Sequence, residues 1–543
     1  MGRPFSNSYV AGEPSARNFI PLDIRSPDAR ADRTRAAASR GIDPALAGEL
    51  TAQQARLPPS PGRDANLAAL LGGGTAVVAT GQQIGLFLGP LYSFYKAASA
   101  VAVARALAAE SGVRVVPLFW LQTEDHDFAE IASCTIAGAD GAPARLSLPD
   151  EAPAESRVSV AHRRLGPDVD RLLGDLAAAL PPGPAADETL ALLRAHYRAG
   201  QPLAAAFGEL MARLFADDGL LVLDPRVAAV ARLALPIVRR AIVETDVIGA
   251  ELAQRASALE TAGFDAQIPV RPDCSLVFFH RDRATGPRHR LSRSAGGWQL
   301  VGCDHLASEG ELAEALAADP LRFSTSALLR PILQDTLLPT AAYVGGPAEV
   351  SYFAQMGPLY ARFALSPPLI VPRARFLCLD ARSRRLLGQL GLSSRDVLAG
   401  DEAALAAQVA PLLPPGAPDP DALAGRVRQL AQQAADLTRQ IAQALPADRN
   451  LERAAARTRG TVAVALERLL RRYRRTLSAR DTVTADRLTR LRQALAPGGV
   501  PQERVYAWPS LAGRHGPAAL RAAVLDRLAA IDPFAGALQE LEL

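Results

Sequence analysis

Residues 75–122 constrain the fold more than any other stretch of this sequence. A short apolar run, Thr75 to Thr80, predicts a buried strand and leads into a glycine-rich turn. A second apolar run, Val113 to Gln122, predicts another strand. Between them, apolar residues recur at helical spacing: Leu91, Phe94, Tyr95, Ala98, Val101 and Ala102. Two strands joined through a helix in this way are parallel, so the pattern predicts an α/β core built on a parallel sheet.

Further strand patterns alternate with helical ones along the first two thirds of the chain. They lie at 219–225, 275–281 and 367–373. This alternation predicts an α/β domain with helices on both faces of its sheet, and we assign it residues 1–395. Within that range, the segment near 270–310 predicts a small β insertion.

The character of the sequence changes after residue 395. A proline-rich linker is expected at 396–420, and apolar residues then follow steps of four and three through 421–495. Two long amphipathic helices joined by a short turn predict an antiparallel coiled-coil hairpin. The hairpin could pack on its own chain, but an exposed seam favours a homodimer interface. Residues 496–543 are expected to return to the core.

Charge and cysteine content exclude several classes of protein. A net charge of +4 over 543 residues gives little reason to expect a nucleic-acid partner. The 16 arginines against 7 acidic residues in 421–495 are better explained by a solvated helical face than by an anionic partner. The 4 cysteines are not at metal-ligand spacing, and no signal peptide or membrane span is expected. We therefore expect a cytoplasmic protein that has no metal centre.

The turn after the first predicted strand is the first candidate site. A glycine-rich turn that opens a helix can present backbone N–H groups and a positive helix end to a phosphate or carboxylate. It matches neither GxGxxG nor a Walker A motif, and an ordinary tight turn is the alternative. The candidate residues are Thr80, Gly81, Gln82, Gln83, Gly85, Gly89 and Pro90.

Lys96 is the only lysine among 60 Lys and Arg residues. Helical spacing places it on one face with Tyr92 and Ser99. A compact ammonium can enter a narrow pocket that a planar guanidinium does not fit. Lys96 and Tyr92 are therefore candidate site residues, with chance retention of one lysine as the alternative.

An acidic run follows the second predicted strand, where open α/β sheets place their ligands. Glu124, Asp125, His126 and Asp127 come directly after the segment that contains Trp120, which is itself a candidate substrate-binding residue. They could bind substrate and act as a base, cap a helix, or bind Mg²⁺, and we favour these in that order. A zinc site is not expected, because no second His or Cys lies at ligand spacing.

Residues 324–353 form a third candidate, a polar set within an apolar frame. Glu349 falls on the first turn of a predicted helix, where the helix dipole favours a carboxylate, so capping is an alternative role for it. Arg373 ends another predicted strand and could reach the same edge. The remaining members of the set are Arg330, Gln334, Asp335, Tyr343, Gly345, Gly346 and Tyr352.

Long motifs in this sequence resemble the BshC family of cysteine ligases of bacillithiol biosynthesis. They are TGQQIGLFLGPLYSFYK (80–96), VPLFWLQTEDHDFAEI (116–131), LLRPILQDTLLPTAAYVGGPAEVSYF (328–353), PPLIVPR (367–373) and PQER (501–504). Leu88 stands where a small polar residue is expected. The resemblance implies a Rossmann-like parallel-sheet core with inserted connecting segments, and a C-terminal coiled-coil hairpin that dimerises.

The resemblance also implies a reaction, in which cysteine is joined through its carboxyl group to the amine of glucosaminyl malate. Amide formation from a free carboxylate is uphill in water, so we expect ATP, together with Mg²⁺, to activate the cysteine. The turn at 81–90 would bind phosphate or malate carboxylate, and Lys96 would neutralise developing charge. Residues 124–127 would orient the sugar and take a proton from its amine, while Arg330, Tyr343 and Glu349 would complete the pocket. A related ligase with another amino acid or acceptor, and a non-catalytic coiled-coil binding protein, are the alternatives.

Overall fold

A computed structural model describes residues 3–138, 141–149, 157–409, 417–444, 448–478 and 482–543. The chain forms two compact units. The first consists mainly of the described residues before 378 together with Glu503–Leu541, and the second consists mainly of Cys378–Gln502.

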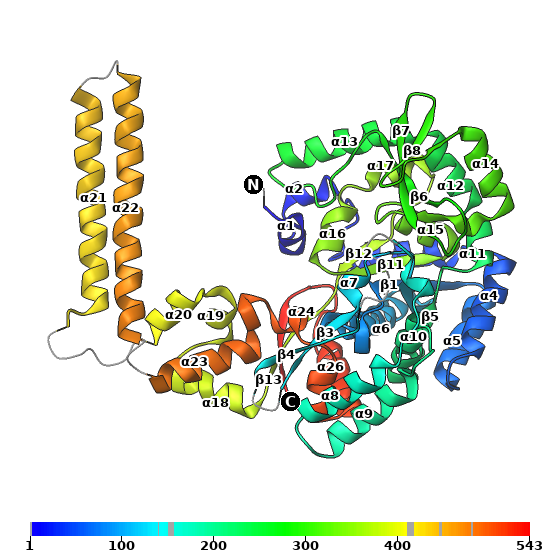
Figure 1. Cartoon of the computed structure of the whole chain (residues 1–543), viewed down its shortest axis with the longest axis horizontal. Helices are drawn as coiled ribbons and strands as arrows, with labels where there is room; N and C mark the ends of the chain where they lie inside the picture. Colours follow the sequence, from blue (N-terminus) through cyan, green and yellow to red (C-terminus); the bar gives the residue numbers. More distant parts are fainter. Residues whose placement is uncertain (1–2, 139–140, 150–156, 410–416, 445–447, 479–481) are drawn as a thin grey trace. The chain divides into compact units, whose positions relative to one another are not determined.

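The first unit is built around a five-stranded parallel sheet (Figure 1). The strand order is β12-β11-β1-β2-β5, so the strand–helix–strand unit predicted from 75–122 lies at its centre. Val77, Val78 and Val116 are fully buried, as expected for a sheet covered on both faces. The strands span β1 Thr75–Gln83, β2 Arg114–Gln122, β5 Leu221–Leu223, β11 Thr340–Gly345 and β12 Leu369–Pro372.

Strand β1 extends three residues beyond the predicted end at Thr80. Gly81, Gln82 and Gln83 still pair with β2, with Gly81 opposite Trp120. The strand continues because Gly81 lets the neighbouring backbone approach closely: a Cβ at this position would lie 3.0 Å from the carbonyl oxygen of Trp120. The two glutamines thus belong to the end of the strand, and the turn begins after them.

Helix α6, Leu91–Ser111, connects β1 to β2 and contacts both strands. It ends at Gly112, whose left-handed conformation (φ 74°) suits glycine. Helix α3, Pro27–Ala38, packs against α6, β1 and β11, and helix α16, Pro347–Phe353, packs against β11 and β12. Further helices before β6 are α1 Phe5–Ala11, α2 Pro14–Arg17, α4 Pro44–Ala55, α5 Pro61–Leu71, α7 Phe128–Ile131, α8 Asp168–Ala179, α9 Pro184–His196, α10 Leu203–Leu214, α11 Ala228–Leu233, α12 Leu235–Val243 and α13 Thr245–Thr261. Those after it are α14 Glu309–Ala318, α15 Arg330–Leu337, α17 Gly357–Arg362, α24 Gln502–Val505, α25 Pro509–His515 and α26 Pro517–Ala529.

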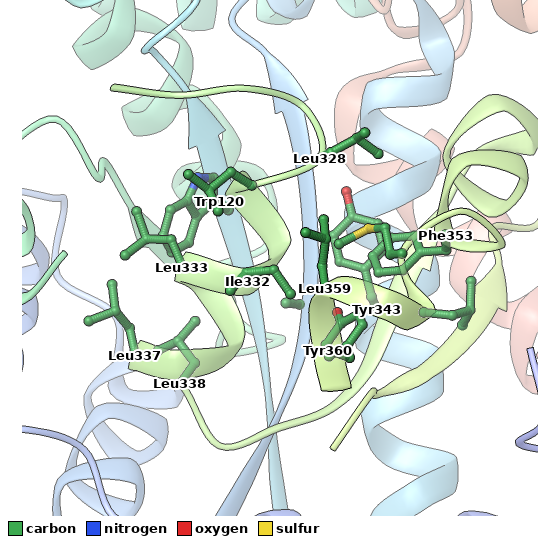
Figure 2. Close-up of a cluster of buried hydrophobic side chains, with 14 of the residues drawn as sticks. Trp120, Leu328, Ile332, Leu333, Leu337, Leu338, Tyr343, Phe353, Leu359 and Tyr360 are labelled. Atoms are coloured by element: carbon green, nitrogen blue, oxygen red, sulfur yellow. The ribbon is translucent and has the colours of Figure 1, made fainter. Parts of the chain in front are cut away.

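The hydrophobic core joins the sheet to helix α15. Figure 2 shows Trp120 of β2 beside leucine and isoleucine side chains of α15 and its flanking residues, and Tyr343 of β11 beside Phe353 of α16. Trp120 is 1% exposed and Tyr343 is fully buried. This packing holds the carboxyl ends of β2 and β11 in place, next to the candidate site.

A second, antiparallel sheet lies in the range where the sequence predicts a β insertion. Its order is β10-β6-β7-β8-β9. The segment 275–281, which was expected among the strands of the α/β alternation, forms β6 of this sheet and not a strand of the parallel one. Its strands are β6 Cys274–His280, β7 Arg288–Ser294, β8 Gly297–Leu300, β9 Leu306–Ala307 and β10 Phe323–Thr325. Two short strands elsewhere, β3 Ser133–Ala137 and β4 Pro143–Ser147, pair with each other.

The second unit contains the predicted helical hairpin. Helices α21, Pro420–Ala444, and α22, Arg449–Ser478, lie side by side (Figure 1, yellow and orange). Residues 482–495 form a separate helix, α23, which packs on α18 (Ala381–Leu390) and α19 (Ser394–Ala399) instead of continuing the hairpin. Within the predicted linker, residues 402–408 form α20, while 410–416 lie outside the described residues, as do the hairpin turn 445–447 and residues 479–481.

Among the described residues, no helix is both long and apolar enough to cross a membrane.

Candidate active site

Three neighbouring cavities lie along the carboxyl ends of β1, β2 and β11. The Lys96 cavity, of about 240 Å³, is the middle one. It shares Gln122, Ala327 and Arg330 with the Arg288 cavity, of about 330 Å³. On the other side it shares Gln82, Gln83, Tyr92 and Arg504 with the Arg145 cavity, of about 310 Å³. The three together form one cleft at the edge where parallel sheets place their ligands.

The lone lysine lies at the bottom of the middle cavity. Lys96 is 2% exposed and donates hydrogen bonds to the carbonyl oxygen of Gly81 (2.7 Å) and to Oε1 of Gln82 (2.9 Å). It also forms an ion pair with Glu349. An ammonium has three donors, and these three acceptors match them. Lys96 therefore links β1 to α16 within the wall of the cavity.

Glu349 accepts from several donors besides Lys96. The hydroxyl of Tyr343 donates to Oε1 (2.6 Å) and the backbone N–H of Gly346 donates to Oε2 (2.7 Å). The second contact caps α16, as the sequence suggested, but the ion pair shows that capping is not its only role. Burial alone would raise the pKa of Glu349, whereas the Lys96 charge and these hydrogen bonds hold it below its usual value. Burial lowers the pKa of Lys96, and the Glu349 charge opposes that effect.

Arg330 lies at the junction of the Lys96 and Arg288 cavities. Its guanidinium donates to Oε1 of Gln334 (2.9 Å) and to the hydroxyl of Tyr352 (3.2 Å), and it lies 5.1 Å from the ring centre of Tyr343. Gln334 in turn donates to Oδ1 of Asp335 (3.0 Å). These partners are neutral side chains, and within the described residues Arg330 makes no ion pair with a carboxylate. The Arg330 side chain lines both cavities.

Two more arginines line the middle cavity. Arg373 is buried and forms a two-pronged ion pair with Glu503, with both N–O distances 2.8 Å. Its guanidinium also lies 5.6 Å from the ring centre of Tyr92. Arg504, by contrast, is exposed and has no ion-pair partner among the described residues, although it lines two of the three cavities.

The acidic run after β2 divides into residues with different surroundings. Oε2 of Glu124 accepts from the backbone N–H (3.2 Å) and the hydroxyl (2.5 Å) of Thr325. Oδ2 of Asp125 accepts from Gln83 (2.8 Å), and Oδ1 lies 3.5 Å from the guanidinium of Arg288. Burial alone would raise the pKa of Asp125, but hydrogen bonds from His126 and Gln83 and the Arg288 charge hold it well below its usual range.

His126 and Asp127 complete the run. Nδ1 of His126 lies 3.3 Å from Arg288, and the residue lines the Arg288 cavity together with Glu124 and Asp125. Oδ1 of Asp127 accepts from the backbone N–H of Glu130 (3.1 Å) and caps the short helix α7. The capping alternative thus applies to Asp127, while the other three acidic-run residues line the cavity.

The turn between β1 and α6 has an unusual backbone. Phe87 and Leu88 are fully buried and have positive φ angles of 50° and 71°. Gly85 and Gly89 approach each other so closely that a Cβ on Gly85 would lie 2.8 Å from Cα of Gly89. The N–H of Leu88 donates to the hydroxyl of Tyr197 (3.1 Å). Leu88 thus packs in the interior, where a polar residue was expected.

Several amides of this turn are already used within the protein. The N–H of Gly85 donates to Gln83, that of Gly89 to Leu86, and that of Leu91 to Tyr506, each at 2.8–3.1 Å. The hydroxyl of Thr80 likewise donates to the carbonyl oxygen of Val344 (2.8 Å). Side-chain cations, and not the backbone of the turn, are therefore the main donors that the cleft offers to an anion. Pro90 and Gly85 line the Arg145 cavity, and Gly346 lines the Lys96 cavity.

Two protein-family models match this chain. A family model described as "Bacillithiol biosynthesis BshC, N-terminal Rossmann-like domain" matches residues 2–374, and one described as "Bacillithiol biosynthesis BshC, C-terminal coiled-coil domain" matches residues 376–528. The chain belongs to the BshC family. The resemblance, the Rossmann-like fold class and the coiled-coil hairpin predicted from the sequence are confirmed.

Curated relatives in the BshC family cover most of the chain. A protein of Koribacter versatilis is 35% identical over 450 residues, which is 83% of this chain and 81% of that protein. A protein of Solibacter usitatus is 33% identical over 444 residues, covering 82% and 80%. One of Salinibacter ruber is 31% identical over 512 residues, covering 91% and 89%. All three carry the name "Putative cysteine ligase BshC".

Several site residues of this BshC-family chain could not be found from sequence patterns alone. Arg288 and Thr325 come from the antiparallel sheet, and Glu503 and Arg504 come from the segment that follows the second unit in sequence. Only the PQER motif gave a signal for the last two, and it did so through family resemblance. Within the described residues, no group of three or more His, Cys, Asp or Glu side chains is arranged to hold a metal ion.

Proposed function

We propose that this protein joins the carboxyl group of cysteine to the amine of glucosaminyl malate and so forms bacillithiol. Family membership and the names of the relatives support the reaction class. One observation carries the assignment of the cleft: two arginines without carboxylate partners, Arg330 and Arg504, line a cavity that opens next to a cluster of acidic groups. An acceptor substrate that has an anionic end and an amine matches this arrangement, with its anionic end at the two arginines and its amine near the acidic groups.

The malate end of the acceptor fits the Lys96 cavity. Lys96 is neutralised by Glu349, and Arg373 by Glu503, so these pairs add no net charge. Arg330 and Arg504 each contribute an unpaired positive charge, which suits the two carboxylates of malate. Charge-assisted hydrogen bonds to guanidinium groups are strong and directional. We therefore assign the malate carboxylates to these two arginines, with Tyr92 and Gly346 in the surrounding wall.

The amine then faces the Arg288 cavity, where Glu124 is the best-placed base. Thr325 holds Oε2 of Glu124, while Oε1 has no hydrogen-bond partner among the described residues. Asp127 is occupied as a helix cap, and the low pKa of Asp125 makes that group a weak proton acceptor. A proton from the attacking amine would therefore pass to Oε1 of Glu124.

The cysteine carboxyl has to be activated before the amine can attack it. ATP would supply the leaving group, as a phosphate or as AMP, and Mg²⁺ would arrive bound to the nucleotide phosphates. Arg330 and Arg504 are assigned to malate, so a phosphate of the nucleotide would be neutralised by another arginine that lines the Arg288 cavity, such as Arg271. The polar rim at Gln82, Gln83 and Gln122 adds uncharged hydrogen-bonding groups around Arg330 and Arg504.

The hairpin supports a second part of the proposal, a homodimer. Large apolar side chains lie exposed on both of its helices, among them Leu437 (57% exposed) and Leu469 (65% exposed). A long apolar seam of this kind is stable in water when a partner covers it. We commit to a second copy of the same chain as that partner.

The decisive experiment is an anaerobic incubation of the purified protein with glucosaminyl malate, cysteine, ATP and Mg²⁺, followed by mass spectrometry of the thiol product. We expect bacillithiol from the wild-type protein and a strongly reduced yield from Glu124→Gln. Leaving out each reactant in turn tests the need for it, and product without ATP would contradict the activation step. Product only with another amino acid or acceptor would support a related ligase instead. Binding of neither substrate would contradict the proposed function.

A further inference from the structure

Arg288 reaches from the antiparallel sheet into the acidic run and is held there on several sides. Its Nε donates to the hydroxyl of Ser324 (2.9 Å), and one terminal nitrogen donates to the carbonyl oxygen of Thr325 (2.6 Å). The guanidinium lies over the ring of Phe278, 3.7 Å from its centre. The side chain is only 6% exposed, so its position is set by packing as well as by hydrogen bonds.

The remaining terminal nitrogen of Arg288 meets the imidazole of His126. It lies 3.3 Å from Nδ1 in hydrogen-bonding geometry. A guanidinium has five N–H donors and no acceptor, so the partner atom has to supply a lone pair. In a hydrogen bond between these two groups Nδ1 of His126 is the acceptor, and a neutral imidazole that accepts at Nδ1 carries its proton on Nε2.

The neighbouring Asp125 is consistent with this tautomer. Oδ1 of Asp125 already accepts a hydrogen bond from the backbone N–H of His126 at 2.7 Å. The Nδ1 atom is farther from it, at 3.4 Å, and Arg288 lies 3.5 Å from the same oxygen. Gln83 donates to the other oxygen, Oδ2, at 2.8 Å, so each carboxylate oxygen has a donor without a proton on Nδ1.

We propose that Arg288 is a positioning residue that fixes His126 as the neutral Nε2–H tautomer, so that His126 serves the cleft as a hydrogen-bond donor. The role of that donor rests on the proposed function: it would stabilise negative charge that develops on the carboxyl oxygen of cysteine when the amine attacks. His126 then has no free lone pair and does not take the proton of the amine. That proton is left to Glu124, which lines the same cavity.

The tautomer can be measured directly by solid-state NMR of the intact protein labelled with ¹³C,¹⁵N-histidine. Spectra would be recorded without substrates at about pH 8.5, where an ordinary imidazole is neutral. The chain has 7 histidines, and a His126→Gln variant identifies the signal of His126 by its loss. We expect a protonated Nε2 and an unprotonated Nδ1. A protonated Nδ1 in the wild-type protein would overturn the proposal.

Variants test whether Arg288 causes this preference. Arg288→Met keeps the length and the packing on Phe278 but removes the donor, and we expect His126 to become a mixture of tautomers. Arg290→Met is the matched control, because Arg290 lies on the same strand and lines the same cavity. It should leave the spectrum unchanged. If Arg288→Met does not fold, Arg288→Lys serves instead, because an ammonium cannot hold Ser324, Thr325 and His126 together. An unchanged tautomer in the folded variant would refute the positioning role.

The kinetic consequence separates this inference from the proposed function. We expect Arg288→Met to lower kcat by roughly 10- to 100-fold with little change in KM, since an electrostatic donor acts mainly on the transition state. The tautomer is measured without substrates, so it can be confirmed even if the protein makes a product other than bacillithiol. Failure of the ligase assay with the expected tautomer would reject the substrates and retain the role of Arg288.

Discussion

Lys96 of α6 and Glu349 of α16 form a buried ion pair at the base of the central cavity. Lys96 also bonds to Gly81 and Gln82 at the end of β1, so one ammonium joins three separate pieces of backbone. Its three donors point in different directions, whereas the donors of a guanidinium lie in one plane. This geometry explains why the only lysine of an arginine-rich chain stands at this position.

Lys96→Arg should therefore damage the protein although it keeps the charge. Inserting a larger group into this packed site is expected to cost about 1–3 kcal/mol of unfolding free energy and to displace Glu349. Lys96→Met should cost more, about 3–5 kcal/mol, because Glu349 is left buried and unpaired. The double variant Lys96→Met/Glu349→Gln should recover part of that loss. Urea unfolding of the four proteins measures these differences, and a Lys96→Arg protein of wild-type stability and activity would contradict them.

Glu503 should make the stability of the first unit depend on pH. Burial alone would raise the pKa of Glu503, but the Arg373 charge and hydrogen bonds lower it below its ordinary value of 4.5. A lowered folded-state pKa means that this stabilisation is fully present above about pH 4.5 and is lost as the pH falls through the folded-state value. Glu503→Gln should cost about 3–5 kcal/mol near neutral pH, because Arg373 loses its counter-charge.

The difference between wild type and Glu503→Gln should shrink as the pH falls below about 4.5, because the wild-type side chain then becomes neutral as well. Unfolding free energies measured between about pH 3 and 7 test this trend. A difference that stays constant over that range would show that the charge of Glu503 is not what stabilises the pair.

Glu124→Gln should separate catalysis from binding. The amide keeps the size of the side chain and can still accept from Thr325, but it does not take a proton. We expect kcat to fall by roughly 10²- to 10⁴-fold while the Kd of glucosaminyl malate changes little. Asp127→Ala is the control within the same acidic run, and it should cost only about 0.5–2 kcal/mol of stability as a lost helix cap. Equal loss of activity in both variants would argue against Glu124 as the base.

Arg504→Gln should weaken binding of the anionic substrate without affecting the fold. One charged hydrogen bond contributes about 1.5–3 kcal/mol, which corresponds to a Kd raised by roughly 10- to 100-fold. Arg145→Gln removes the same charge from a residue that lines only the neighbouring cavity. Titration calorimetry with glucosaminyl malate should show a clear loss in the first variant and a small one in the second. Equal effects would indicate general electrostatic attraction.

Leu437→Glu in the hairpin should convert the proposed dimer to a monomer. A charge placed on the apolar seam would have to be buried at the interface, and an unpaired buried charge is costly. Val243→Glu is the control, because Val243 is 70% exposed and lies outside the hairpin. Sedimentation equilibrium should give half the wild-type mass for the first variant only. A wild-type protein that is already monomeric would contradict the dimer.

Local patterns predicted the parts of the site that lie close together in sequence. The apolar runs around β1 and β2 and the helical spacing of α6 are local properties, so the strand–helix–strand unit was recognisable. The position of the acidic run followed from the general rule that parallel strands carry ligands at their carboxyl ends. The end of β1 was misplaced, because glycine is usual in turns and its pairing with β2 depends on the neighbouring strand.

The sequence by itself determined the parallel core, the hairpin and which polar segments gather at one edge of the sheet. Hydrophobic periodicity sets these features, and it acts over a few residues at a time. Only the tertiary structure decided the role of each polar side chain. Arg288 meets His126, Glu503 neutralises Arg373, and Lys96 meets Glu349 across long stretches of chain. Charge and hydrogen-bond pairing depend on distances of a few ångströms in space, and these arise only when distant segments pack together.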